Sequence, residues 1–111
     1  MIVATSDSLP GKKIVRVLGL TKGNSIRCTH VGTDIKAMLQ NLVGGEISEY
    51  TAMIAQARDQ AVDRMVDQAR EMGANAIVAM RFSTTEVVHG AAEILAYGTA
   101  VWAEDAPENR S

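Results

Sequence analysis

The sequence predicts an α+β domain in two layers, an antiparallel sheet packed on one long helix, with accessory short strands and a short helix. Residues 46–72 place an apolar side chain at every third or fourth position and contain no proline, which is typical of a helix with one buried face. Apolar runs at 13–20, 76–82 and 92–102 indicate strands on both sides of this helix in the chain. Strands grouped around one helix are typical of the α+β class.

The N-terminal part of the chain indicates strands joined by turns. Pro10 and Gly11 favour a reversal, because proline fixes φ and glycine tolerates unusual backbone angles. The expected order is a strand at 2–5, a turn at 7–11, a strand at 13–20, a turn at 21–24 and a weaker strand at 25–31.

Two helices are expected in the middle of the chain. A short one follows a cap at Thr33 or Asp34 and ends at Gly44. The long one covers 46–72, and Gly73 is suited to the residue after its end, where a left-handed backbone is common.

The C-terminal part indicates a pair of strands followed by a tail. We expect strands at 76–82 and 92–102, joined through 83–90 as a hairpin into which the strand ends run. Residues 104–111 are polar and contain Pro107, so we expect a disordered tail after a single domain at 1–103.

Composition excludes several classes of protein. The 111 residues carry a formal charge of −2, whereas nucleic-acid-binding domains normally present a basic face. No apolar stretch approaches the ~20 residues that span a bilayer. One cysteine cannot form an intrachain disulfide, which suits the reducing cytoplasm. We therefore expect a cytoplasmic protein that binds neither nucleic acid nor membrane.

The strand at 13–20 is apolar on both faces. Ile14 and Leu18 point to one side while Val15 and Val17 point to the other. One helix covers one face of a sheet, so the second apolar face predicts contact with further copies of the chain.

Three blocks of sequence resemble the YbjQ-like family of small bacterial proteins. They are Gly44-Gly-Glu-Ile-x-x-Tyr-Thr51, Gly73-Ala-Asn-Ala-Ile-Val-x-x-Arg-Phe82 and Glu93-Ile-Leu-Ala-Tyr-Gly-Thr-Ala-Val101. The resemblance covers almost the whole chain and implies a dodecin-like subunit that assembles into a ring-shaped homopentamer. The family carries a heavy-metal-binding description without an established biochemical role. His89 stands where such sequences often have a small residue, so no role for it follows from the resemblance.

Cys28 and His30 are the candidate metal ligands. On a strand at 25–31 both side chains would leave the same face, and thiolate with imidazole suits zinc or copper(I). A closed zinc site needs four ligands, so His89 or acidic residues of another subunit would have to complete it. The alternative is a small buried hydrophobic residue beside a surface imidazole.

Catalysis has less support in the sequence. A nucleophilic Cys28 would need a base held by an orienting group, and the sequence identifies no such group. We therefore expect no enzyme and no resident cofactor. A small ligand between subunits is a further alternative, for which Trp102 is the one tryptophan available for stacking.

Two charged features have alternative interpretations. A row at i, i+4 spacing on the long helix is either a solvated face, a surface that meets basic residues of a neighbouring subunit, or a divalent-cation surface: Asp59, Asp63, Asp67 and Glu71. Arg81 lies in an apolar strand, so it either pairs with a carboxylate such as Glu86 or Glu93, or stands where the strand reaches solvent.

Overall fold

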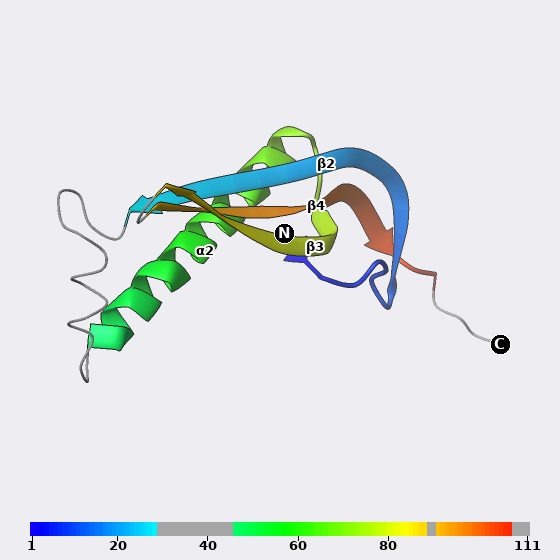
Figure 1. Cartoon of the computed structure of the whole chain (residues 1–111). Helices are drawn as coiled ribbons and strands as arrows, with labels where there is room; N and C mark the ends of the chain where they lie inside the picture. Colours follow the sequence, from blue (N-terminus) through cyan, green and yellow to red (C-terminus); the bar gives the residue numbers. More distant parts are fainter. Residues whose placement is uncertain (29–45, 89–90, 108–111) are drawn as a thin grey trace.

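A computed structural model of the chain describes residues 1–28, 46–88 and 91–107. Four strands form one sheet in the order β1-β3-β4-β2, and one long helix lies across it (Figure 1). The elements are β1 (Ile2–Val3), β2 (Lys12–Cys28), α2 (Glu46–Glu71), β3 (Ala76–Val88) and β4 (Ala91–Asp105). The two-layer α+β fold is confirmed.

The sheet is mixed, where a wholly antiparallel one was expected. β4 pairs antiparallel with β2 on one side and with β3 on the other, but β1 pairs parallel with β3. A parallel pair needs a long crossover between its strands, and the chain from β2 through α2 supplies it.

The long helix agrees with its sequence signals. Its last turn closes through two hydrogen bonds, from Gly73 N–H to Arg70 O at 3.0 Å and from Ala74 N–H to Ala69 O at 3.0 Å. Gly73 has φ of 87°, the left-handed conformation that this closing motif requires. The expected end of the helix is therefore confirmed.

The turn expected at 21–24 is wrong, because β2 continues without interruption to Cys28. The glycine in this segment serves a close approach between layers: a Cβ on Gly23 would overlap backbone atoms of Ala61 and Met65 in α2. Beside it, Thr21 donates a hydrogen bond of 2.7 Å to Met65 O. The residues that suggested a turn are those on which the helix rests.

The hairpin strands are longer than expected. The strand ends run into the expected connection, as predicted, but farther: β3 continues through 83–88, and β4 begins at Ala91 and ends at Asp105. Residues 104 and 105 are thus part of a strand and not of the expected tail. Cross-strand hydrogen bonds extend a strand beyond its most apolar part, which periodicity alone does not reveal. The expected short helix, Gly44 and His89 lie outside the described residues.

Apolar residues form two clusters, one on each face of the sheet. The larger lies between α2 and the sheet, and small helix residues such as Ala57, Ala61 and Ala69 let the layers approach closely. The smaller lies on the other face, where Leu9 of the N-terminal segment covers Val78 and Val101. The N-terminal segment therefore covers part of the face that the helix leaves open.

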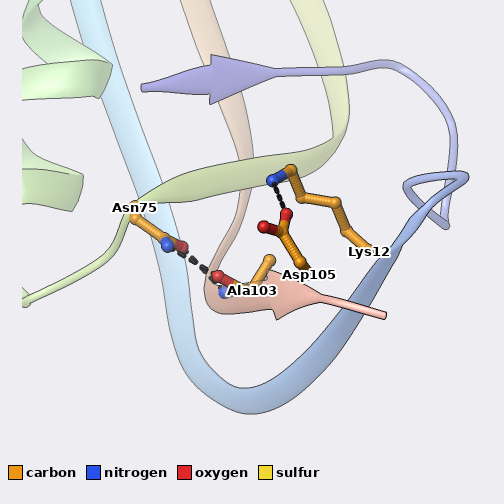
Figure 2. A network of polar contacts seen from close by, with 4 residues as sticks. All are labelled: Lys12, Asn75, Ala103 and Asp105. Atoms are coloured by element: carbon orange, nitrogen blue, oxygen red, sulfur yellow. Dashed lines mark hydrogen bonds and ion pairs between the residues drawn. The ribbon is translucent and has the colours of Figure 1, made fainter. Parts of the chain in front are cut away.

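Polar contacts hold the C-terminal end of β4 (Figure 2). Asn75 donates from Nδ2 to Ala103 O at 2.7 Å and accepts from Ala103 N–H at 2.7 Å, so its amide takes the place of one more strand residue. Lys12 Nζ lies 2.6 Å from Asp105 Oδ1 and joins the start of β2 to the end of β4. This hydrogen bond and the lysine charge hold the pKa of the Asp105 carboxyl below its ordinary value.

Candidate functional site

Of the two residues predicted to bind metal, the structure describes Cys28 alone. Cys28 is the last residue of β2 and pairs with Ala91 of β4, while His30 lies outside the described residues. In the described part of the chain no three His, Cys, Asp or Glu side chains come together as a metal site would require. A site that uses Cys28 and His30 stays a prediction.

A different surface stands out on β2, where the N-terminal arm of the strand passes beyond the helix. Met72, at the end of α2, lies 3.5 Å from the position that a Cβ on Gly19 would occupy. The residues before Gly19 therefore extend past the end of α2, and Figure 1 shows the strand curving away there. We call this extension, together with Gly19 and Leu20 at its base, the β2 arm (residues 12–20).

Large apolar side chains are exposed on this arm. Val17 is 69% exposed, Leu20 63% and Val15 40%. Farther along β2, Thr21 and Ser25 are buried against α2, so the alternation of the strand places Leu20 and Ile26 on the face away from the helix. Ile26 is accordingly 58% exposed. Val17 and Leu20 lie opposite Val101 and Thr99 on the same face, and neighbouring exposed apolar side chains of this kind usually mark an interaction surface.

The charges of β2 and α2 are segregated. All charged residues of β2 are basic: Lys12, Lys13, Arg16, Lys22 and Arg27. α2 carries six acidic residues against three basic ones. The basic strand and the acidic helix give a nearly neutral chain two surfaces of opposite sign, a property that the overall charge conceals.

Side chains of α2 cover the middle of the free edge of β2. Lys22 N–H donates to Gln68 Oε1 at 2.7 Å, and Arg64 Nη1 donates to Asn24 O at 2.6 Å. These bonds occupy the strand-edge groups that another strand would need for pairing. Sequence reasoning missed Gln68 and Arg64, because their role depends on which strand lies beside that flank of the helix.

A hollow of about 400 Å³ lies beside this covered edge. Its lining mixes polar and apolar side chains from both layers: Lys22, Gly23, Asn24, Gln68, Glu93 and Leu95. Asn24 Nδ2 donates to Glu93 Oε2 at 3.4 Å across it. With its polar groups partly engaged in this way, the hollow indicates no particular ligand chemistry.

The acidic row of α2 is exposed along its described length. Asp67 Oδ1 lies 3.7 Å from Arg70 Nη1. Arg64 does not pair with the row, because its guanidinium bonds to Asn24 O at the edge of β2. Asp59 and Asp63 are exposed and have no ion-pair partner among the described side chains. The row therefore presents carboxylates that the subunit itself compensates only in part.

Arg81 bonds to backbone oxygen atoms. Its Nη1 donates to Thr5 O at 2.8 Å and to Met80 O at 2.8 Å, and the residue is exposed. The described contacts agree with the alternative in which the strand reaches solvent, and Arg81 ties the N-terminal segment to β3.

Trp102, considered for ligand stacking, stands on β4 opposite the β2 arm. It pairs with Arg16 across the strands and is 39% exposed. Its Nε1 donates to Glu104 Oε1 at 3.4 Å. The indole thus forms part of the surface around the arm.

Comparison with known proteins identifies relatives along the whole chain. The YbjQ family model, described as "Putative heavy-metal-binding", matches residues 1–104. A UPF0145 protein of Clostridium perfringens is 51% identical over 106 residues, which cover 96% of this chain and 100% of the relative. A UPF0145 protein of Methanosarcina acetivorans is 52% identical over 101 residues, which cover 91% of this chain and 95% of the relative.

A solved structure from Pediococcus pentosaceus shares the fold. It is a protein with unknown function from the DUF74 family, and the similarity covers 94% of this chain and 98% of that chain with a TM-score of 0.63. At 18% sequence identity this likeness concerns the fold alone. Among the described residues, no helix has the length and apolar character needed to cross a membrane.

Proposed function

Because this chain belongs to the YbjQ-like family, we propose that it functions as a homo-oligomeric, non-enzymatic protein of the cytoplasm, built as a ring of five copies. The observation that carries the proposal is the uncovered apolar surface of β2, on which Val17 and Leu20 are the most exposed large side chains. Burying a Val or Leu side chain contributes about 1.5–3 kcal/mol, so a few such contacts repeated around a ring give substantial stability.

The dimensions of the two layers support the same proposal. β2 has 17 residues and spans about 56 Å at ~3.3 Å per residue, whereas α2 has 26 residues and spans about 39 Å at ~1.5 Å per residue. The helix ends beside Gly19, so it leaves the strand residues from Lys12 to Val17 uncovered. A neighbouring copy supplies the missing cover, which is the usual solution for a small core.

Native mass spectrometry of untreated protein tests this assembly. We expect a mass near five times the 11.9 kDa of one chain, about 60 kDa, and light scattering that gives the same mass at micromolar concentration. A folded monomer at that concentration would refute the proposal. The same spectrum tests the small-ligand alternative, because a molecule retained between subunits would add its own mass to the ring.

Heavy-metal binding through Cys28 and His30 is the second candidate function, favoured by the description of the family model. Two ligands leave a zinc shell half empty, so the site would need ligands from neighbouring copies. Calorimetric titration with zinc and copper(I) should compare the wild type with Cys28→Ala and His30→Ala. Tight binding lost in both variants would establish the site, and weak binding indifferent to both would exclude it.

A further inference from the structure

We infer that neighbouring subunits meet through unlike surfaces, the acidic row of α2 in one copy packing against the β2 arm of the next. This inference rests on the proposed oligomer and specifies how its subunits make contact. The first surface consists of the exposed carboxylates of Asp59, Asp63 and Asp67 with the adjoining Val62 and Val66. The second is the arm, with Lys13 and Arg16 on one face and Val17 and Leu20 on the other.

Charge complementarity is the first argument. Lys12 is already neutralised by Asp105, and Glu104 accepts a hydrogen bond from Trp102. Lys13 and Arg16 remain exposed, without an ion-pair partner among the described residues. On the helix, Asp59 and Asp63 are likewise uncompensated. Contact between two copies would pair these basic side chains with the acidic side chains, which have no ion-pair partner in the described part of their own subunit.

The apolar parts of the two surfaces also correspond. Val62 and Val66 are half-buried at the edge of the core cluster, on the flank of the helix that adjoins Asp59 and Asp63. On the arm, the register with β4 places Lys13 and Arg16 on one face and Val17 and Leu20 on the other, and all four side chains are exposed. A neighbouring copy that packs around both faces of the arm would bury its apolar side chains and meet its basic ones, the combination of apolar and charged contacts found in protein interfaces.

Symmetric pairing of two β2 strands is the less favourable arrangement. It would bring together two strands whose charged residues are all basic, and like charges placed opposite each other are destabilising. Gln68 and Arg64 also occupy the edge groups at Lys22 and Asn24 that strand pairing requires. A contact between unlike surfaces is head-to-tail, and such contacts close into a ring when the rotation between copies allows it.

Charge reversal on each surface tests the inference. Asp63→Lys and Arg16→Glu should each raise the subunit concentration of half-dissociation at least tenfold, because every copy in the ring carries the change. The double variant Asp63→Lys/Arg16→Glu should recover part of that loss. Asp7→Lys changes the charge equally at an exposed turn outside both surfaces and is the matched control, expected to leave the mass unchanged. Circular dichroism verifies the fold of each variant.

Cross-linking of the wild type provides an independent measurement that no folding defect can obscure. A zero-length carbodiimide reagent joins a lysine amine to a carboxylate in contact with it. In rings refolded from a mixture of ¹⁵N-labelled and unlabelled chains, we expect mixed-isotope peptides that link Lys13 to Asp59, Asp63 or Asp67.

The outcomes separate this inference from the proposed function. A five-subunit wild type whose mass is insensitive to both reversals, with no linked peptide from Lys13 to the acidic row, would overturn the inference and leave the ring intact. A monomeric wild type would overturn both. Linked peptides between two copies of the β2 arm would favour the symmetric arrangement and also overturn the inference.

Discussion

The middle of β2 and its N-terminal arm belong to one strand but differ in what surrounds them. The middle is covered by α2, with Thr21 bonded to Met65 O and Gly23 directly under the helix backbone. The arm extends past the helix, and Val17 and Leu20 are exposed. The strand is thus completed by its own subunit in one half only, which makes the other half the natural place for a partner.

Gly23→Val should cause the largest loss in the free energy of unfolding, because it disrupts the packing of β2 against α2. A Cβ there overlaps backbone atoms of α2, which cannot move aside as the end of a side chain can. Overpacking of this kind typically costs 1–3 kcal/mol, and with backbone on the receiving side we expect ~3 kcal/mol or more. Urea denaturation measures the change. Ile26→Val, on the exposed face of the same strand, should stay within about 0.5 kcal/mol, and equal effects at the two positions would contradict the packing described.

Asn75→Ala should have the next largest effect, at the end of β4 beneath the arm. It removes two hydrogen bonds of 2.7 Å to Ala103 and leaves a partly buried N–H and C=O without these partners. We expect a loss of ~2 kcal/mol in the free energy of unfolding. Asn75→Asp is the informative control: its carboxylate still accepts from Ala103 N–H but sets an oxygen against Ala103 O in place of the donor, so it should also be less stable than the wild type. If the alanine substitution leaves the stability unchanged, the Asn75 amide does not stabilise this end of β4.

Gly73→Val tests the end of the helix that stops short of the arm. Space is not limiting, because no atom lies within 4 Å of the added Cβ, but φ of 87° is strained for any β-branched residue. The expected cost is somewhat above ~1 kcal/mol. Gly73→Asn should cost less, since asparagine tolerates the left-handed region. Thermal melts of the two variants should differ in that order, and the reverse order would mean that backbone strain is not the cause.

The smallest effect is expected from pH at the base of the arm. The pKa of Asp105 is lowered by Lys12, so the native state favours its charged form. This stabilisation is present above the unfolded-state pKa of about 3.9 and is lost as the pH falls through the lower folded-state value. Between pH 5 and pH 3 the wild type should therefore lose slightly more stability than Asp105→Asn, measured by urea denaturation at each pH. Parallel pH profiles would show that the ion pair at this exposed site contributes nothing.

The sequence by itself determined the features whose causes are local. Apolar periodicity defined α2, and Gly73 marked its end because a left-handed residue after a helix is a requirement of the chain itself. The apolar runs identified the strands for the same reason, and blocks spread along the chain indicated the family. Cys28 and His30 could be selected as potential metal ligands from their residue types. Those types do not show whether the same two residues of a neighbouring copy lie close enough to complete a site.

The tertiary structure decided what depends on elements far apart in the chain. Gly23 looked like a turn residue, but a glycine is needed there because the backbone of α2 lies against it. That part of α2 is some forty residues away in the sequence, so no local pattern indicates the contact. Gln68 and Arg64 looked like ordinary helix surface until β2 was placed beside them. The exposed arm arises because α2 ends beside Gly19, while β2 begins at Lys12. Strand lengths, registers and close approaches between layers are set by contacts between residues that are distant in the sequence. Such a contact cannot be recognised from either of the two segments alone.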